Sequence, residues 1–191
     1  AGNIGSFCTM KEHKTQADMK KLDLVELCET MVQQFSGLCI AKKRALTFSC
    51  EEKTLYTLGD RDKLRRMLLN LLSNSLRSTA EAGQISLRLG LTADGTRIQI
   101  VVTDDGAGMT PEALDRVFGG MDETPDPDGP GSGLGLGLPI ANGIAKLHGG
   151  TLMVESRPGK GTKVIVTLRK WPDSELELHE PVLTYGSSAQ W

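Results

Sequence analysis

Three polar side chains recur along one predicted helix at a spacing that could hold a metal–phosphate group. Asn70, Asn74 and Arg77 are four and three residues apart, so they share one face of a helix. Amide oxygens can bind a hard cation, and a guanidinium can hold a phosphate by its charge. The same pattern, taken alone, is also typical of an ordinary solvated helix face. The prediction of a phosphate site therefore depends on the motifs that accompany it.

A carboxylate followed by two glycines comes at the end of a predicted strand. Residues 104–109 read Asp-Asp-Gly-Ala-Gly-Met and follow the apolar-rich segment 98–102. Glycine lets a backbone lie close to a ligand, and the Asp104 carboxylate can accept a hydrogen bond from an exocyclic amine. The alternative interpretation of this segment is an ordinary turn.

Two further glycine-rich segments lie nearer the C-terminus. Residues 131–138 read Gly-Ser-Gly-Leu-Gly-Leu-Gly-Leu and precede a predicted helix. Glycines allow backbone N–H groups to face an anion, and a helix N-terminus adds a favourable dipole. The segment matches neither a P-loop nor a Rossmann fingerprint, since it lacks the Lys-Ser/Thr ending and no strand leads directly into it. Residues 156–162 (Ser-Arg-Pro-Gly-Lys-Gly-Thr) could by themselves be only a hairpin turn.

Hydrophobic periodicity predicts the elements that must position these motifs. The predicted helices cover 23–36 (with Asp23 and Glu26 as a possible capping box), 60–80, a short stretch from Thr110-Pro111, and 136–148. Two short strands are predicted within 44–58, and two hairpins are predicted, one from 84–91 with 97–103 and one from 151–156 with 162–169. The Gly- and Pro-rich stretch 119–135 is predicted to be a loop. Because helices and hairpins occur without regular βαβ alternation, we expect a two-layer α/β sandwich. Helices would cover one face of a mixed, largely antiparallel sheet.

Length and composition limit the remaining possibilities. The chain has 191 residues, which suits one domain at 20–169. Residues 1–19 are predicted to be an N-terminal tail or the end of a preceding element, and residues 170–191 a C-terminal tail. A net charge of -2 gives no basic excess, so neither nucleic acid nor an anionic membrane is an expected partner. Since no long apolar run or signal peptide occurs, we expect a cytoplasmic chain without direct membrane contact, while a longer parent could be anchored in a membrane. The cysteines lack zinc-ligand spacing and are predicted to be buried reduced thiols.

In combination, the motifs resemble the ATP-binding domain shared by histidine kinases, DNA gyrase, MutL and the Hsp90 chaperones. The similarity is greatest to sensor histidine kinases and covers about residues 20–169. It is carried by residues 68–77 (N box), 104–108 (first glycine box), 117–118 (a reduced F box), 131–136 with Ile140 and 148–150 (second glycine box) and 159–162 (last glycine box). The resemblance implies the Bergerat-type α/β sandwich of that family, with ATP and Mg²⁺ as cofactors.

The resemblance also implies a role for each matching position. Asn74 would ligate Mg²⁺ through its side-chain oxygen, while Asn70 and Arg77 would lie at the phosphates, and these three would carry the catalysis. Asp104 would bind the adenine amino group, and Thr162 would support the adenine end. The implied nucleotide-binding set is Asn70, Asn74, Arg77, Asp104, Gly106, Gly108, Met109, Gly131, Ser132, Gly133, Leu134, Gly135, Leu136 and Thr162.

Position 70 separates the activities found within this superfamily. Members that hydrolyse ATP with water typically carry a Glu four residues before the Mg²⁺-binding Asn, where a carboxylate can act as general base. Asn70 is a poor base, which favours transfer to a protein side chain over hydrolysis. The resemblance thus implies the catalytic domain of a two-component sensor histidine kinase. Its partners would be ATP, a dimerisation domain that carries the phosphoacceptor histidine and, indirectly, a response regulator.

Several features leave other functions open. His13, His148 and His179 do not fit the phosphoacceptor pattern, so the acceptor would lie on a domain outside this chain. Residues 122–130 contain four acidic residues but no Lys or Arg, where such kinases often place a basic residue on the γ-phosphate. Ser78 stands where an aromatic often packs near the nucleotide. The alternatives are a nucleotide-binding regulatory module without phosphotransfer and, disfavoured by Asn70, an ATPase that dimerises through its N-terminus.

Overall fold

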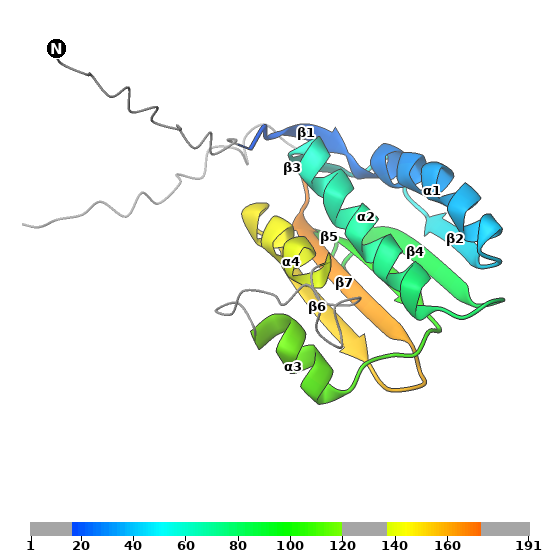
Figure 1. The fold of residues 1–191 in the computed structure, drawn as a ribbon. Helices are drawn as coiled ribbons and strands as arrows, with labels where there is room; N and C mark the ends of the chain where they lie inside the picture. Colours follow the sequence, from blue (N-terminus) through cyan, green and yellow to red (C-terminus); the bar gives the residue numbers. More distant parts are fainter. Residues whose placement is uncertain (1–16, 120–136, 173–191) are drawn as a thin grey trace, which may run out of the picture.

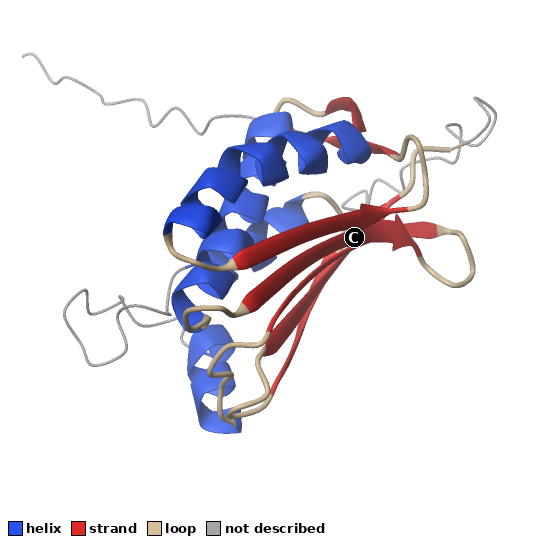
Figure 2. Cartoon of the chain, turned by 90° about the vertical axis from the view of Figure 1, so that its right-hand side faces the viewer, coloured by secondary structure: helices blue, strands red, loops and turns tan. Residues whose placement is uncertain are grey.

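The chain folds into two layers, a five-stranded sheet and the helices that cover one of its faces (Figures 1 and 2). The computed structural model describes residues 17–119 and 137–172. The large sheet has the order β2 (Ala45–Cys50), β4 (Gln84–Leu91), β5 (Arg97–Asp104), β7 (Thr162–Arg169) and β6 (Thr151–Ser156). The helices are α1 (Leu24–Ala41), α2 (Arg61–Ser78), α3 (Pro111–Gly119) and α4 (Gly137–Leu147). The β2–β4 pair is parallel and the other pairs are antiparallel, which confirms the predicted mixed α/β sandwich.

The apolar stripe of α2 fixes this helix on the sheet. Leu64, Met67, Leu68, Leu71 and Leu72 are all 1% exposed or less. They pack into one core cluster with inward-facing strand residues, among them Ile98, Ile100 and Val102 of β5. Burying one such side chain contributes about 1.5–3 kcal/mol, so the stripe sets the orientation of the polar face of α2 relative to the sheet.

The two short strands predicted within 44–58 form, but they belong to different sheets. β2 joins the edge of the large sheet, in parallel with β4, while β3 (Tyr56–Gly59) pairs with β1 (Lys20–Asp23) in a separate two-stranded sheet. The strand β1 was not predicted, because its four residues carry no clear alternation. Helix α1 also runs five residues past the predicted end, through Gly37 to Ala41.

The predicted capping box at the start of α1 is wrong, although Asp23 does cap the helix. Its carboxylate accepts hydrogen bonds from the backbone N–H groups of Val25 (3.0 Å) and Leu55 (3.1 Å). The Glu26 carboxylate instead binds Arg61 of α2, at 2.6 and 2.9 Å. The reason is tertiary: α2 brings a guanidinium within reach, and two hydrogen bonds to this cation replace a single bond to a backbone N–H.

The end of α4 is tied to the start of α2. The ring of His148, just after α4, is buried; its Nδ1 lies 2.8 Å from the Ile144 carbonyl, and its Nε2 accepts the Asp60 N–H at 3.0 Å. The Asp60 carboxylate caps α2 by accepting the Lys63 N–H at 3.1 Å. The predicted helix-end role of His148 is therefore confirmed, and the side chain also joins two helices.

The prediction of buried thiols is confirmed for two of the three described cysteines. Cys28 and Cys39 are buried and free, Cys50 is free and half-buried, and Cys8 lies outside the described residues. Burial raises the pKa of the Cys28 thiol to about 12, so this group is an unreactive part of the core. Across the described ranges, the helices are too short or too polar to cross a membrane.

Candidate functional site

The polar face of α2 holds two asparagines and an arginine, as the spacing predicts. Arg77 Nη2 donates to Asn74 Oδ1 at 2.6 Å. Asn70 is half-buried, and its Nδ2 is fully buried without a hydrogen-bond partner among the described residues. An unsatisfied buried donor costs about 1–3 kcal/mol, a cost that an acceptor oxygen on a ligand removes. An ordinary solvated helix face does not account for Asn70.

The start of α4 lies directly against this face. A Cβ atom on Gly137 would lie 2.8 Å from Asn74 Oδ1 and 2.9 Å from its Nδ2, so a larger residue would require the Asn74 amide to move. The first turn of a helix presents free N–H groups and the positive end of its dipole, both of which favour anions. The contact therefore places an anion-favouring helix end next to the predicted metal ligand.

Asp104 ends β5 as a buried carboxylate that is 6% exposed. Its Oδ1 accepts hydrogen bonds from the Gly106 N–H (2.9 Å) and from Ser78 Oγ (3.3 Å). Its Oδ2 has no hydrogen-bond partner within the described ranges. Because Ser78 is the last residue of α2, the carboxylate lies at the end of the helix that carries Asn74. One oxygen is thus held in place and the other is available to a ligand.

Glycines let the loops around Asp104 come close together. Gly108 has φ +67°, and a Cβ there would lie 2.0 Å from the Arg157 carbonyl oxygen. Gly161 has φ +76°, and a Cβ there would lie 1.9 Å from the carbonyl oxygen of Asp104. Both positions combine a left-handed backbone with backbone contacts that no side chain could tolerate. The loops of 104–109 and 156–162 are therefore one packed unit.

A residue that the sequence did not single out joins these two loops. Ser156 Oγ accepts the Met109 N–H at 2.8 Å, lies 3.0 Å from the Gly161 carbonyl oxygen and 2.9 Å from Thr162 Oγ1. The register of β5 and β7 also places Thr162 opposite Asp104. The only sequence signal for Ser156 was its place at the start of the last glycine segment.

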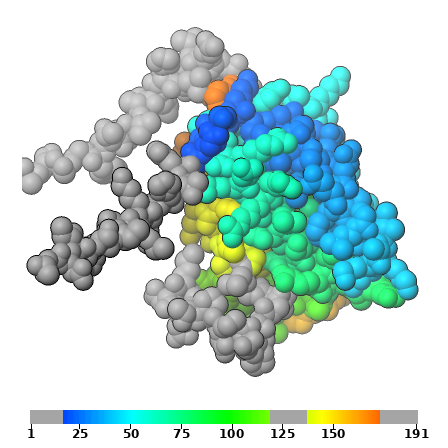
Figure 3. Space-filling model, turned by 45° about the horizontal axis from the view of Figure 1, so that its top comes forward, coloured from blue at the N-terminus to red at the C-terminus, as the bar shows by residue number. Residues whose placement is uncertain are grey.

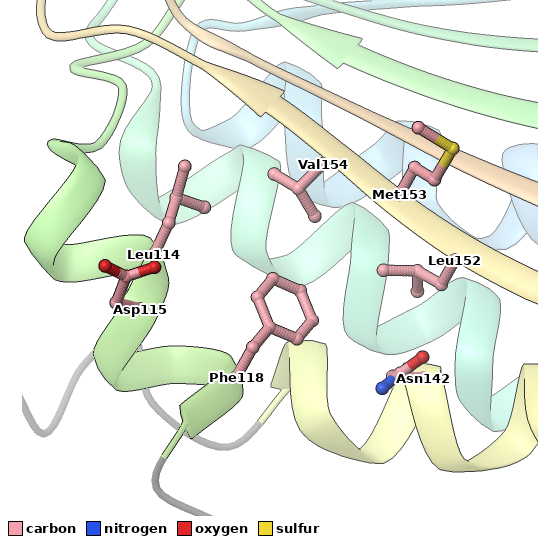
Figure 4. A pocket seen from close by; sticks show the side chains of 7 residues that line it. All are labelled: Leu114, Asp115, Phe118, Asn142, Leu152, Met153 and Val154. Carbon is pink, nitrogen blue, oxygen red and sulfur yellow. The ribbon is translucent and has the colours of Figure 1, made fainter.

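Two neighbouring hollows open beside these groups. Asp104, Ser156, Gly161 and Thr162 line a hollow of about 610 Å³, together with cationic side chains of the 157–163 segment. A second hollow, of about 310 Å³, shares the lining residues Leu114 and Val154 with the first. In Figure 4 Leu114 and Phe118 of α3 point toward β6, from which Leu152 and Val154 point back. Asp115 is the one charged residue in the lining of the second hollow, whereas five charged side chains line the first, which is therefore the better candidate for a polar ligand.

The predicted site residues that the structure describes lie along the C-terminal half of α2 and at the adjoining end of the sheet. Asn70, Asn74 and Arg77 lie on that helix, and Asp104 with its glycines and Thr162 lie at the adjoining sheet end. Gly131, Ser132, Gly133, Leu134, Gly135 and Leu136 lie outside the described residues, as does the acidic stretch 122–130.

The fold is thus a two-layer α/β sandwich with a group of polar side chains between one long helix and the end of the large sheet. Residues 59–172 match the family model described as "Histidine kinase-, DNA gyrase B-, and HSP90-like ATPase", and the chain belongs to this family. The family match includes the predicted N box, the first glycine box and the last one.

Sensor kinases are among the similar proteins in sequence. The chain is 34% identical over 142 residues to the sensor histidine kinase ZraS of Klebsiella oxytoca, covering 74% of this chain and 29% of ZraS. It is 28% identical to the adaptive-response sensory kinase SasA of Parasynechococcus marenigrum, covering 91% of this chain and 45% of SasA. The chain thus spans less than half the length of these relatives.

Solved structures show the same fold. The full-length ShkA in complex with AMPPNP superposes with a TM-score of 0.67 at 26% identity, over 81% of this chain and 32% of ShkA. The catalytic domain of histidine kinase ThkA has a TM-score of 0.68 at 24% identity, over 81% of this chain and 99% of that domain. The second comparison supports the fold alone.

Proposed function

We propose that this chain is the ATP-binding catalytic domain of a two-component sensor histidine kinase. It transfers the γ-phosphoryl group of ATP to a histidine on a dimerisation domain that lies outside this chain. In this reaction the bond between the γ-phosphorus and the β–γ bridging oxygen breaks, a phosphorus–nitrogen bond forms on the imidazole, and ADP leaves. A response regulator is the proposed later recipient of the phosphoryl group.

One observation carries this proposal: two polar groups without hydrogen-bond partners among the described residues lie along the C-terminal half of α2, one at the sheet end beside Ser78 and one at Asn70. Asp104 Oδ2 is available at one end, and the buried Asn70 Nδ2 lacks a partner within the described ranges at the other. Ser78, which contacts Asp104, is eight residues from Asn70 along α2, or about 12 Å. A ligand with an amine-bearing base at one end and an oxyanion chain at the other satisfies both groups.

The residues present also fit a bound Mg²⁺ ion. This ion keeps several waters and takes few protein ligands when it binds together with phosphates. The single amide oxygen of Asn74, beside the start of α4, meets that need. When bound, the ion would neutralise charge on the phosphates, and Arg77 would add its own positive charge at the same place. Positioning and charge neutralisation are the main demands of phosphoryl transfer.

The amide at position 70 favours transfer over hydrolysis. Asn70 cannot take a proton from water, while its unpartnered Nδ2 can donate to a phosphate oxygen. The alternative is a regulatory module that binds nucleotide without transferring the phosphoryl group. The observation in its favour is that the sequence from Val117 to Ala145 contains no Lys, Arg or His to contact the γ-phosphate.

Calorimetry with ATP and Mg²⁺ tests the nucleotide site. We expect the wild type to bind, Asp104→Ala to abolish binding, and Asn74→Ala to remove the Mg²⁺ dependence of binding. Asn142→Ala is the matched control, because Asn142 lines the neighbouring hollow and not the one beside Asp104. A wild-type chain that does not bind ATP would contradict the proposal.

Transfer is tested separately by adding the dimerisation domain of a related kinase and γ-labelled ATP. Label on that domain supports the kinase function, and its dependence on Asn74 ties the reaction to this site. ATP binding without label on any supplied dimerisation domain would favour the regulatory module. Release of free phosphate at the same rate with and without the acceptor would instead indicate hydrolysis.

A further inference from the structure

Arg66 extends the polar face of α2 by one turn beyond the predicted site. It precedes Asn70 and Asn74 by four and eight residues, so the three side chains form one stripe along the helix. Arg66 is exposed and, among the described residues, makes no hydrogen bond or ion pair. Asp62, four residues earlier, forms no ion pair with it within 4 Å. Its guanidinium is therefore available to a ligand.

The other arginines of the first half of α2 are directed elsewhere. Arg61 binds the Glu26 carboxylate of α1 through two hydrogen bonds, and Arg65 Nη2 lies 3.5 Å from Gln34 Oε1 of the same helix. Arg66 follows Arg65 by one residue, which turns its side chain by about 100° around the helix. Figure 3 shows that α2 reaches the surface between α1 and α4. Two arginines thus tie α2 to α1, and the third faces solvent beside Asn70.

The order of groups along α2 indicates which part of a nucleotide Arg66 would meet. Asp104 contacts Ser78 at the C-terminal end of the helix, followed toward the N-terminus by Asn74 and then Asn70. Arg66 comes next, about 6 Å beyond Asn70, a distance that an extended arginine side chain can span. A nucleotide with its base at Asp104 would therefore present its inner phosphates near Asn74 and its terminal phosphate near Arg66.

Charge also favours this position for a cation. The sequence from Val117 to Ala145 supplies no Lys, Arg or His, so α4 offers no positive side chain before Lys146, and the cation of α3 is Arg116. Arg77 already lies on Asn74, at the opposite end of the stripe. Lys63 is the nearest other cation on this face, but it is seven residues from Asn70, or about 10 Å. Arg66 is the better placed of the two.

We infer that Arg66 is a γ-phosphate-binding residue, whose guanidinium contacts the terminal phosphate of ATP and thereby separates ATP from ADP. The inference depends on the proposed nucleotide site. Arginine suits this role, because its planar N–H groups can bind two phosphate oxygens at once. The same contact would stabilise the charge on the phosphoryl group during its transfer.

The test compares Arg66→Gln with Arg65→Gln in the full chain. The two variants lose the same charge from adjacent exposed positions, so a general electrostatic effect would appear in both. Affinity for the β,γ-imido analogue of ATP and for ADP is measured by calorimetry with Mg²⁺. We expect Arg66→Gln to weaken binding of the ATP analogue about tenfold, because one charge-assisted contact is lost. Binding of ADP, which lacks the terminal phosphate, should weaken less than twofold. Arg66→Lys should restore part of the difference, and Arg65→Gln should show none.

Three outcomes would overturn the inference. An equal loss of analogue and ADP affinity in Arg66→Gln, or no loss of either, excludes a contact specific to the γ-phosphate while the proposed site stands. Equal effects of Arg66→Gln and Arg65→Gln show a general charge effect. A wild-type chain that binds neither nucleotide overturns the proposed function, and this inference with it.

Discussion

Replacing Asp104 with Asn tests the adenine-recognition role at one atom. The carboxylate has two unequal oxygens: Oδ1 accepts the Gly106 N–H at 2.9 Å, and Oδ2 is available to a ligand. In the variant, the amide oxygen must keep the Oδ1 position, because an amide nitrogen there would face the Gly106 donor. The amide nitrogen therefore takes the Oδ2 position, and an acceptor becomes a donor.

The magnitude follows from the hydrogen bonds that change. An amine bound to an ionised carboxylate contributes about 1.5–3 kcal/mol, and two donors facing each other in a buried site cost about 1–3 kcal/mol more. The total of roughly 3–5 kcal/mol corresponds to a loss of ATP affinity of about 100-fold or more. The folded state should change little, by less than about 1 kcal/mol, because the Gly106 contact is kept.

The assay is a comparison of ATP and ITP by calorimetry, with thermal unfolding as the control for folding. ITP carries a carbonyl oxygen where ATP carries the amine, so the new donor of Asp104→Asn should accept it. We expect the ratio of ITP to ATP affinity to rise in the variant by at least tenfold. If Asp104→Asn unfolds like the wild type and still binds ATP within threefold, Asp104 does not recognise the amine and the assignment of the adenine end is wrong.

Three further predictions concern the packing around the site. Gly161→Ala should lower the free energy of unfolding, measured in urea, by at least about 2 kcal/mol, because φ is +76° and a Cβ would lie 1.9 Å from the Asp104 carbonyl oxygen. The control Gly90→Ala has open space around the added Cβ, so its free energy of unfolding should be close to that of the wild type. Asp60→Ala should lower the free energy of unfolding by about 1 kcal/mol at neutral pH through loss of the helix cap. Backbone N–H groups of Lys63 and Asp18 lower the pKa of the Asp60 carboxyl in the folded state. Its contribution to stability is therefore fully present above about pH 4 and is lost as pH falls through the lowered folded pKa. The unfolding free energies of wild type and Asp60→Ala should converge in acid, and a difference that stays constant with pH would contradict this account. His148→Ala should lower the free energy of unfolding by about 1–3 kcal/mol, since it leaves the Asp60 N–H without its acceptor, while the backbone N–H of residue 148 still pairs with the Ile144 carbonyl. A thermal unfolding curve unchanged from wild type would rule out the tie between α4 and α2.

The sequence by itself determined the elements that have strong local signals. The apolar stripe of α2 repeats at helical spacing, and the Asp60 carboxylate caps it as Asp residues commonly do. Asp94-Gly95 and the glycines of 157–161 mark two hairpin turns, both of which form. The spacing of Asn70, Asn74 and Arg77 was readable for the same reason, because residues on one helix face keep a fixed relation whatever the rest of the chain does.

Partners that are far apart in the chain could not be read in this way. The strand β2 was predictable, but its parallel pairing with β4 was not. That pairing depends on how the segments between the two strands pack on the sheet, which the residues of β2 do not encode. The small sheet was missed because β1 is too short to show a pattern, although β3 was predicted as a strand. Glu26 binds Arg61 rather than completing a capping box, because α1 and α2 lie side by side.

Burial and direction of polar groups were decided only by the tertiary structure. Three examples are the buried Nδ2 of Asn70, the Ser156 hydroxyl between two loops, and the different directions of Arg65 and Arg66. Each depends on what another segment brings to that point in space, and the free energy of a polar group changes greatly with the presence of a partner. The sequence identified which residues could bind a nucleotide, and packing decided which of their atoms are left for it.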